Sequence, residues 1–484
     1  MNTIRANDNK MNLLIIMPDQ MRADYLGCYG HPTIGTKNID RLATEGLKFD
    51  NCYCAAPLCG PSRISFVTST YFSEHDHRNY GSTVEPDIPN IVTSLKNEGY
   101  ITGMFGKNHC FTYERLEEIW DEVDEICVGN YDEHPEFKHS FTAFSMEEDH
   151  VYNLTGKLTD QTIDFMSRHS KEKPFLAWVN YQDPHPAFTC PPPYNTMFDP
   201  RDMPMPKSYE DYKTSKSPIR NHIWRIHSEM ELATEYDIKK AIAMYMGQIR
   251  YVDDSVGRMM DYLEETGLSE NTIVVFLADH GELLGDHGMT HKNPTFYDAL
   301  TKIPLIIKYP NADWKLKSFN GLMEEVDIVP SILDMLNIDI PPTMVGKSWV
   351  KDIEEGNDKG KDTVICEAGY GAPTYRKPVE GLKLKAPVAP TCYGPGAMIR
   401  RGDWKLTIYY DDQCELYYIK EDPHEMNNLY DDNSVKDIRN ELTLLLTKRL
   451  LGVKVRDVGL QWPYDKYPHD VRCEPLEHTI VYTH

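Results

Sequence analysis

The sequence lacks any apolar run long enough to cross a membrane. Its longer apolar stretches, such as residues 13–17 and 272–278, fall far short of the about 18 residues that a membrane helix needs. Residues 1–10 are polar and are not followed by the apolar segment of a signal peptide. We therefore expect a protein with no membrane contact and no export signal, with the cytoplasm as its location.

Positive charge is scarce. Lysine and arginine number 51 against 75 aspartates and glutamates, which gives a net charge of −24. Such a self-repelling acidic surface argues against nucleic acid or an anionic membrane as a partner. A protein of this composition that handles an anionic substrate has to gather its positive groups at one place.

The sequence also lacks the cysteine pattern of a disulfide framework. Eleven cysteines, an odd number, are scattered over 484 residues. We expect most of them to be reduced. Hydrophobic residues make up 40% of the chain, which is enough to bury a large core.

Four apolar runs each end abruptly in a polar cluster and are typical of buried strands. The runs are residues 13–17, 101–105, 175–181 and 273–278. Helical patterns lie between them at residues 38–45, 91–98, 158–169 and 238–265. This alternation predicts an α/β fold with a large, mostly parallel mixed sheet flanked by helices. Ligands of such sheets bind beyond the carboxyl ends of the strands, so the four polar clusters point to one site.

The C-terminal part changes character. Short runs at residues 397–400, 405–410 and 415–419 predict an antiparallel meander, and the periodicity of residues 434–451 predicts a helix packed on it. We expect a catalytic domain over residues 11–375, a smaller antiparallel-sheet-plus-helix subdomain over 396–451, and a tail over 452–484 that favours a homo-oligomer. Two long irregular segments, 190–221 and 370–395, are candidates for substrate walls.

The sharpest local signal surrounds Cys59. Pro61 and Ser62 indicate a helix start, which would place Cys59 at a helix N-terminus whose exposed N–H groups favour an anion. On position alone two other interpretations stay open. Cys59 is then a buried structural thiol, or it shares a zinc ion with Cys52 and Cys54.

The segment Cys59-Gly60-Pro61-Ser62-Arg63 resembles the signature of the formylglycine-dependent (type I) sulfatases of the alkaline phosphatase superfamily. Further family motifs are matched in family order, over roughly residues 11–450, by Met17-Pro18-Asp19-Gln20, Gly106-Lys107-Asn108-His109, Gln182-Asp183-Pro184-His185-Pro186, Ala278-Asp279-His280-Gly281, Lys292 and Gly402-Asp403-Trp404-Lys405-Leu406. The resemblance implies that a maturation enzyme oxidises Cys59 to formylglycine.

The resemblance also implies a divalent-cation site. Asp19 and Asp279 offer hard oxygen ligands, and Gln20 and His280 would complete the site together with the modified residue 59. An aspartate after a strand can instead cap a helix. The commoner sulfatase pattern has a second Asp where Gln20 stands and Asn or Gln where His280 stands. This exchange lowers the ligand charge and softens the site, so Mn²⁺ becomes a competitor, while Ca²⁺ remains our first choice.

The implied mechanism begins with the hydrated aldehyde at position 59. One hydroxyl attacks sulfur to give a covalent sulfate ester, the other loses its proton to His109, and sulfate leaves as the aldehyde re-forms. Arg63 would hold the diol. Lys107 and Lys292 would neutralise the transferring group, and His185 would protonate or hydrogen-bond the leaving oxygen.

Two further residues bear on the substrate. Phosphonate monoester hydrolases of the superfamily resemble the chain in the Asp-Gln and Asp-His elements but typically lack a lysine at the position of Lys107, so Lys107 favours sulfate. Asn79 resembles an asparagine near the transferred group in choline sulfatases, or is simply a turn residue. We expect a hydrolase of a small alkyl, aryl or sugar sulfate monoester. The alternatives are a phosphonate monoester hydrolase or phosphodiesterase, and an unmodified metal-binding pseudoenzyme.

Overall fold

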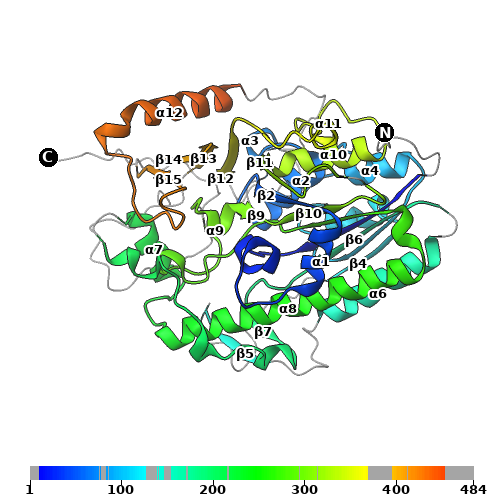
Figure 1. Ribbon diagram of the computed structural model, residues 1–484, viewed down its shortest axis with the longest axis horizontal. Helices are drawn as coiled ribbons and strands as arrows, with labels where there is room; N and C mark the ends of the chain where they lie inside the picture. The colour runs from blue at the N-terminus through cyan, green and yellow to red at the C-terminus, as the bar shows by residue number, and fades with distance from the viewer. Residues whose placement is uncertain are drawn as a thin grey trace.

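The structure is a computed structural model (Figure 1). It describes residues 10–75, 77, 83–85, 87–126, 139, 141–145, 154–170, 173–214, 217–293, 295–312, 314–368, 395–410 and 413–452. Asn79, nearly all of the predicted tail and most of the predicted wall at 370–395 lie outside this range. Among the described residues, no helix combines the length and the apolar character needed to cross a bilayer.

The four predicted strands form the centre of a nine-stranded sheet. They are β1 (Asn12–Pro18), β3 (Ile101–Gly106), β6 (Phe175–Tyr181) and β8 (Thr272–Leu277). They lie side by side in the order β8-β1-β6-β3, and every neighbouring pair is parallel. Both faces of these strands are covered, which is why they appear in the sequence as unbroken apolar runs.

The outer strands carry a weaker signal and were not predicted. The full order is β11-β2-β10-β8-β1-β6-β3-β4, with β9 paired to β2. The outer strands are β2 (Leu47–Tyr53), β4 (Glu122–Glu125), β9 (Lys302–Ile303), β10 (Leu305–Lys308) and β11 (Ser318–Glu324). Strand β10 runs antiparallel to both β2 and β8, which makes the sheet mixed, as expected. Several of these strands are short and polar, so no apolar run marks them.

Helices cover both faces of the sheet (Figure 1). The four predicted helices are found as α1 (Lys37–Glu45), α4 (Ile91–Asn97), α6 (Leu154–His169) and α8 (Glu235–Glu265). The other α-helices described before the C-terminal sheet are α2 (Cys59–Thr68), α3 (Phe72–His75), α5 (Leu116–Ile119), α7 (Ile219–His227), α9 (Asp298–Thr301), α10 (Ile328–Met335) and α11 (Val350–Glu355). A small parallel pair, β5 (Ala143–Ser145) and β7 (Phe188–Cys190), lies apart from the main sheet.

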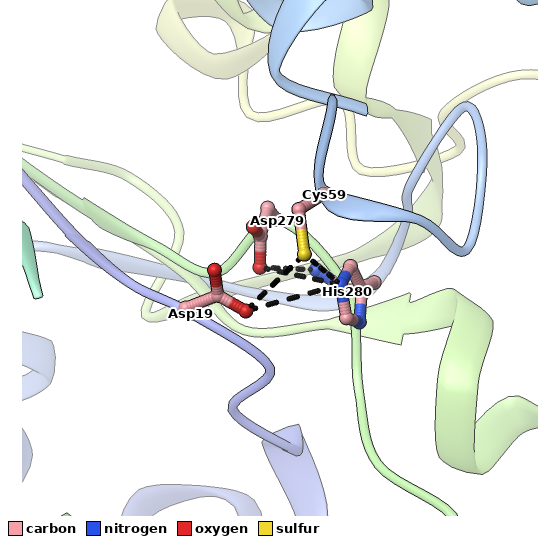
Figure 2. Close-up of side chains that lie close together, drawn as sticks. All are labelled: Asp19, Cys59, Asp279 and His280. Atoms are coloured by element: carbon pink, nitrogen blue, oxygen red, sulfur yellow. Dashed lines mark hydrogen bonds and ion pairs between the residues drawn. The ribbon is translucent and has the colours of Figure 1, made fainter. Parts of the chain in front are cut away.

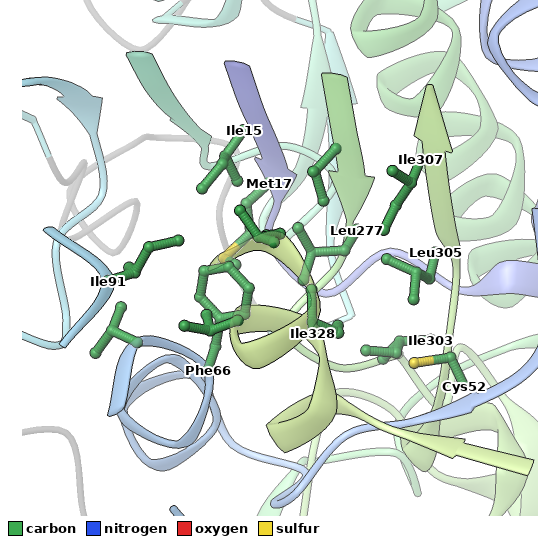
Figure 3. Packing of buried hydrophobic residues seen from close by; sticks show 14 of the residues in the cluster. Ile15, Met17, Cys52, Phe66, Ile91, Leu277, Ile303, Leu305, Ile307 and Ile328 are labelled. Atoms are coloured by element: carbon green, nitrogen blue, oxygen red, sulfur yellow. The ribbon is translucent and has the colours of Figure 1, made fainter. Parts of the chain in front are cut away.

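Alternate side chains of the central strands enter two different cores. On β1, Ile15 and Met17 pack with α2, α4 and α10, as Figure 3 shows around Phe66, Ile91 and Ile328. Leu14 and Ile16 point to the opposite face and pack with α1, α6 and α8. The period of two along each strand thus fixes which helices cover which face, and it holds the carboxyl ends of all four strands at one edge.

The C-terminal subdomain contains the predicted antiparallel sheet and the helix packed on it. Strands β12 (Val364–Ala368), β13 (Gly396–Arg401), β14 (Trp404–Tyr409) and β15 (Glu415–Tyr418) form an antiparallel sheet in that order. Helix α12 (Lys436–Leu451) buries Leu442 and Leu446 against it. The fold class is therefore confirmed. Strand β12 was not predicted and belongs to this second sheet, although it lies within the range 11–375; the domain boundaries themselves stay predictions.

Candidate active site

The four polar clusters meet at the carboxyl edge of the sheet, as expected. The first and third are joined directly, since the Asp19 amide donates to the Tyr181 carbonyl at 3.0 Å. The second joins the third through the Lys107 amide, which donates to the Asn180 carbonyl at 3.1 Å. Asp279 follows β8, the other neighbour of β1, so one edge presents all four segments.

A group of metal-ligating side chains lies at this edge (Figure 2). Its members are Asp19, Cys59, Asp279 and His280, all fully buried, with one ligand atom of each within 4.8 Å of the others. The Cys59 Sγ is 3.1 Å from His280 Nε2 and 3.5 Å from Asp19 Oδ1. Within the described part of the chain, the group that could hold a metal contains neither Cys52 nor Cys54. This argues against the zinc interpretation of the three cysteines.

His280 presents the correct nitrogen for a metal ligand. Its Nδ1 lies 2.8 Å from the Gly281 carbonyl oxygen, which can only accept a hydrogen bond, so Nδ1 carries the proton. The lone pair of Nε2 therefore faces Cys59 and Asp19. Two carboxylates, one imidazole and residue 59 suit a hard or borderline divalent cation, and the partner at Nδ1 fixes the imidazole tautomer.

The helix α2 delivers Cys59 to this group. It begins at Cys59, directly after Leu58, whose backbone is extended with φ −154°. The first N–H groups of a helix have no partner within it, so they face whatever binds at position 59. The helix start at Cys59 is thus found where the sequence placed it.

The Arg63 side chain contacts both aspartates of the predicted cation site, Asp19 and Asp279. Its Nε donates to Asp279 Oδ2 at 2.9 Å, and its Nη2 lies 3.4 Å from Asp19 Oδ2. Its Nη1 donates to the Asn180 Oδ1 at 2.6 Å. The guanidinium is fully buried. Sequence reasoning missed Asn180, although it is the one amide side chain within the apolar run of β6.

The Lys107 ammonium group lies near both the Cys59 thiol and the Asp19 carboxylate. Its Nζ is paired with Asp19 Oδ2 and lies 3.7 Å from Cys59 Sγ. The preceding Gly106 turns the chain toward the site with φ 102°, and an added Cβ would lie 2.1 Å from the Asn180 carbonyl oxygen. A side chain at position 106 would therefore displace Lys107.

The electrostatics of the site favour an anion at position 59. Burial and Asp19 raise the pKa of the Cys59 thiol, but the charges of Lys107 and Lys292 act against them, and the pKa is lowered well below its usual range. Burial opposes the charge on Lys107, yet Asp19 and Cys59 leave its pKa raised. An anionic group of a substrate would meet the same field.

Gln20, which follows Asp19, is hydrogen-bonded both to Asp279 and to Lys292. The Gln20 amide nitrogen of the backbone donates to Asp279 Oδ1 at 2.9 Å. The Lys292 Nζ donates to Gln20 Oε1 at 2.7 Å and to His185 Nε2 at 2.7 Å. The structure thus places Gln20 beside the cluster with its side-chain oxygen facing Lys292, and its part as a metal ligand stays a prediction.

Comparison with known proteins identifies the family. The family model described as Sulfatase matches residues 11–338. The chain belongs to the sulfatase family. This confirms the resemblance to the type I sulfatases of the alkaline phosphatase superfamily, and with it the enzyme class: the chain is a sulfatase, a hydrolase of sulfate esters. A second family model, described as N-sulphoglucosamine sulphohydrolase, C-terminal, matches residues 387–451.

Similar proteins extend over almost the whole sulfatase. An N-acetylglucosamine-6-O-sulfatase of Bacteroides thetaiotaomicron is 26% identical and covers 94% of this chain and 89% of its own length. An arylsulfatase of Clostridium perfringens is 27% identical, covering 92% of this chain and 95% of its own. In fold, the phosphonate monoester hydrolase of Agrobacterium radiobacter has a TM-score of 0.75 at 23% identity, over 91% of this chain and 96% of that one.

His109 lies at the thiol as well. It has a left-handed backbone with φ 50° and hydrogen-bonds Cys59. Burial and the charge of Lys107 lower its pKa, so the imidazole is neutral and able to accept a proton. The structure therefore brings Cys59, Lys107 and His109 of this sulfatase together. Asn79 lies outside the described residues and stays a prediction.

Two positioning residues of the sulfatase were not predicted from the sequence. Glu282 is fully buried, pairs with the Gln20 Nε2, and accepts from the backbone of Leu284 and His291, which shapes the loop leading to Lys292. Gln248 on α8 donates to Asp183 Oδ1 at 3.0 Å and so holds the loop of His185. A glutamate directly after Asp-His-Gly is a signal that could have indicated the first, whereas Gln248 is one of many polar residues on a long helix.

Proposed function

We propose that this sulfatase hydrolyses a small sulfate monoester at the Cys59 cluster, with Cys59 oxidised to formylglycine. The observation that carries this proposal is the position of the Cys59 thiol. It is fully buried, lies 3.1 Å from His280 Nε2, and is close to the positive charges of Arg63, Lys107 and Lys292. An aldehyde hydrate there would face a cation and a transferring anion together.

The residues that would hold a divalent cation are Asp19, Asp279, His280, Gln20 and the modified residue 59. We propose Ca²⁺ first and Mn²⁺ second, because the set mixes hard carboxylates with one imidazole. When bound, the cation supplies positive charge that lowers the pKa of a nearby hydroxyl and polarises the sulfate group.

The protein side chains divide the remaining work. Lys107 and Lys292 oppose the charge on the transferring group, and Arg63 fixes the two aspartates against position 59. His109, neutral and hydrogen-bonded to residue 59, accepts the proton of its second hydroxyl. His185 and Lys292, which are hydrogen-bonded to each other, act together on the leaving oxygen.

For the alcohol part we propose a sulfated sugar. Support comes from the relative named N-acetylglucosamine-6-O-sulfatase and from a protein of similar fold solved with D-glucosamine-2-N,6-O-disulfate, with a TM-score of 0.73 at 22% identity over 94% of this chain and all of that chain. A screen of sulfated monosaccharides beside aryl, alkyl and choline sulfates tests this. Turnover confined to aryl sulfates would reject the sugar assignment.

A phosphonate monoester hydrolase or phosphodiesterase is the second candidate. The Asp-Gln and Asp-His elements and the fold likeness to a phosphonate monoester hydrolase favour it, whereas Lys107 favours sulfate. Measurement of kcat/KM for paired aryl sulfate and aryl phosphonate esters decides between them. We expect the sulfate ester to be the better substrate; a higher value for the phosphonate would reverse the assignment.

The third candidate, a metal-binding pseudoenzyme, requires that Cys59 remain a thiol. Peptide mass spectrometry of protein made in a host with the maturation enzyme tests this, because conversion to formylglycine lowers the mass by about 18 Da, the difference between the two side chains. An unmodified and inactive protein from such a host would favour the pseudoenzyme.

A further inference from the structure

A buried glutamate holds both sides of the loop that carries Cys59. Glu325 opens the short helix η10 (Glu325–Asp327), and its side chain is fully buried. Its Oε2 accepts from the Ala55 amide at 2.9 Å, and its Oε1 lies 2.7 Å from Ser62 Oγ. Ala55 precedes Cys59 and Ser62 follows it, so one carboxyl group spans the nucleophile segment.

The same helix η10 also holds the far end of α2. Ser69, directly after α2, donates through Oγ to the Val326 carbonyl at 2.6 Å. Helix α10 continues from η10 and lies beside α2 in the upper layer of Figure 1. The position of Cys59 relative to the sheet is therefore set by η10 at both ends of its helix.

The Ser62 hydroxyl lies between two oxygen atoms. Its Oγ is 2.6 Å from the Asp279 backbone carbonyl and 2.7 Å from Glu325 Oε1. A hydroxyl has one proton to donate, and a carbonyl oxygen can only accept. When Ser62 donates to the Asp279 carbonyl, the proton of the second hydrogen bond has to come from Glu325. The order is then Glu325 Oε1–H to Ser62 Oγ, and Ser62 Oγ–H to the Asp279 carbonyl.

We propose that Glu325 is a positioning residue that acts as a neutral, protonated acid and couples the Cys59 segment to the strand end bearing Asp279 and His280. This inference rests on the proposed function. It gives Ser62 a part in the folded enzyme in addition to its place in the maturation motif.

The surroundings of Glu325 agree with a neutral acid. Burial and, less strongly, the Asp279 carboxylate raise the pKa of Glu325 to about 8, although the hydrogen bond from the Ala55 amide acts to lower it. The buried thiols of Cys52 and Cys54 also face this carboxyl group. A protonated acid makes both of its hydrogen bonds, and leaves the Ser62 proton for the Asp279 carbonyl, without adding a negative charge beside Asp19 and Asp279.

The coupling predicts a specific kinetic signature. Displacement of a nucleophile by about 1 Å can lower a rate roughly 100-fold. Lys107 pairs with Asp19, and Lys292 donates to Gln20 and His185, so the lysines proposed to bind the anionic group are held by other partners and substrate binding should survive. Loss of the Glu325 hydrogen bonds should therefore lower kcat and leave KM within about threefold.

The test compares Glu325→Gln with Glu325→Leu in the full-length, converted enzyme. The Gln amide has an NH₂ donor for Ser62 and an oxygen acceptor for Ala55, so it reproduces the neutral acid, and we expect kcat within about threefold of wild type. Leu has a similar volume without polar atoms, and we expect a loss of kcat of roughly 100-fold. Mass spectrometry should show equal conversion of Cys59, since position 325 is outside the motif.

The outcomes separate cleanly. A Leu variant with wild-type kcat overturns the positioning role. A converted, folded Gln variant as slow as Leu overturns the neutral acid. When the Leu variant does not fold, Glu325→Asp replaces it, because its shorter side chain cannot span Ala55 and Ser62. If converted wild-type enzyme turns over neither sulfate nor phosphonate esters, the proposed function is wrong. The coupling is then tested by the rise in Tm on adding Ca²⁺ or Mn²⁺, which should be kept in Glu325→Gln and reduced in Glu325→Leu.

The neighbouring Glu324 is the matched control. It is equally buried but accepts from Tyr71 Oη at 2.7 Å and from the Ile365 amide at 2.7 Å, and it pairs with Lys361. These three partners lie outside residues 55–62, the segment that Glu325 spans. Glu324→Gln should lower Tm and leave kcat and KM unchanged, which distinguishes a general loss of stability from a displaced nucleophile.

Discussion

Lys292 donates a hydrogen bond to His185 Nε2 across 2.7 Å. The His185 Nδ1 faces the Pro186 carbonyl and therefore carries its own proton, and burial together with the charge of Lys292 lowers the pKa of the ring well below its usual range. His185 is thus neutral, and Lys292 holds the proton between the two side chains. In the proposed mechanism the leaving oxygen would meet this hydrogen-bonded pair instead of a single acid.

The pair should act as a unit on poor leaving groups. We expect Lys292→Ala and His185→Ala each to lower kcat/KM about 10²–10⁴-fold for an alkyl sulfate, where the departing oxygen needs a proton, and much less for 4-nitrophenyl sulfate. The double variant should lose little more than either single one, and full additivity would contradict a shared function.

Cys59→Ala should abolish turnover without unfolding the protein. The thiol is buried among Asp19, Asp279 and His280, and its removal leaves a small space without breaking the Arg63 contacts. Circular dichroism and the cation-induced rise in Tm serve as controls. Turnover at the wild-type rate in this variant would be fatal to the mechanism.

Lys107→Ala should discriminate between substrates. Removal of the lysine takes a positive charge from the transferring group and from Asp19, so we expect kcat/KM for an aryl sulfate to fall about 10²–10³-fold. The aryl phosphonate should lose less, so the ratio of the two shifts toward phosphonate. An unchanged ratio would remove Lys107 from substrate selection.

Cation binding should raise the stability of the protein. The cluster holds two buried carboxylates and one imidazole, and a cation at 100 times its Kd adds about 2.7 kcal/mol to the free energy of unfolding. Differential scanning fluorimetry after chelation, with Ca²⁺ or Mn²⁺ added back, measures the effect and ranks the two ions. Asp279→Asn should reduce the response; an equal response in that variant would place the ion elsewhere.

Asp253 provides a test of stability remote from the active site. On α8, its Oδ1 accepts from the backbone amides of Asn38 at 3.0 Å and Ile39 at 2.8 Å, which caps α1 from another helix. Burial raises the pKa of Asp253 to about 6. The unfolded chain has a pKa of about 3.9 at this residue, so between pH 4 and 6 the folded state binds a proton that the unfolded state releases.

Stability conferred by Asp253 should therefore fall as the pH rises through this window, by at most about 1.4 kcal/mol per unit. Asp253→Asn cannot titrate, so the advantage of wild type over this variant should be larger at pH 4.5 than at pH 8 in urea unfolding. Asp254→Asn, one residue along α8, is the control. A pH-independent difference for Asp253 would contradict the linkage.

The central strands were predictable because two covering layers make each of them apolar throughout. Asp19, Lys107, His185 and Asp279 follow directly from those strands, so their convergence could be foreseen. Glu325 and Asn180 could not, because their partners come from segments far away in the chain. The outer strands β10 and β11 escaped for a related reason: their pairing is decided by neighbours that a local pattern does not include.

The complete burial of position 59 bears on when this residue can be modified. Helix α2 packs against η10, and within the described part of the chain the side chain of its first residue is fully buried. The proposed oxidation of this cysteine by another enzyme would therefore be favoured while the chain is still unfolded. In that case, the fraction of active protein in a preparation would depend on the relative rates of folding and oxidation.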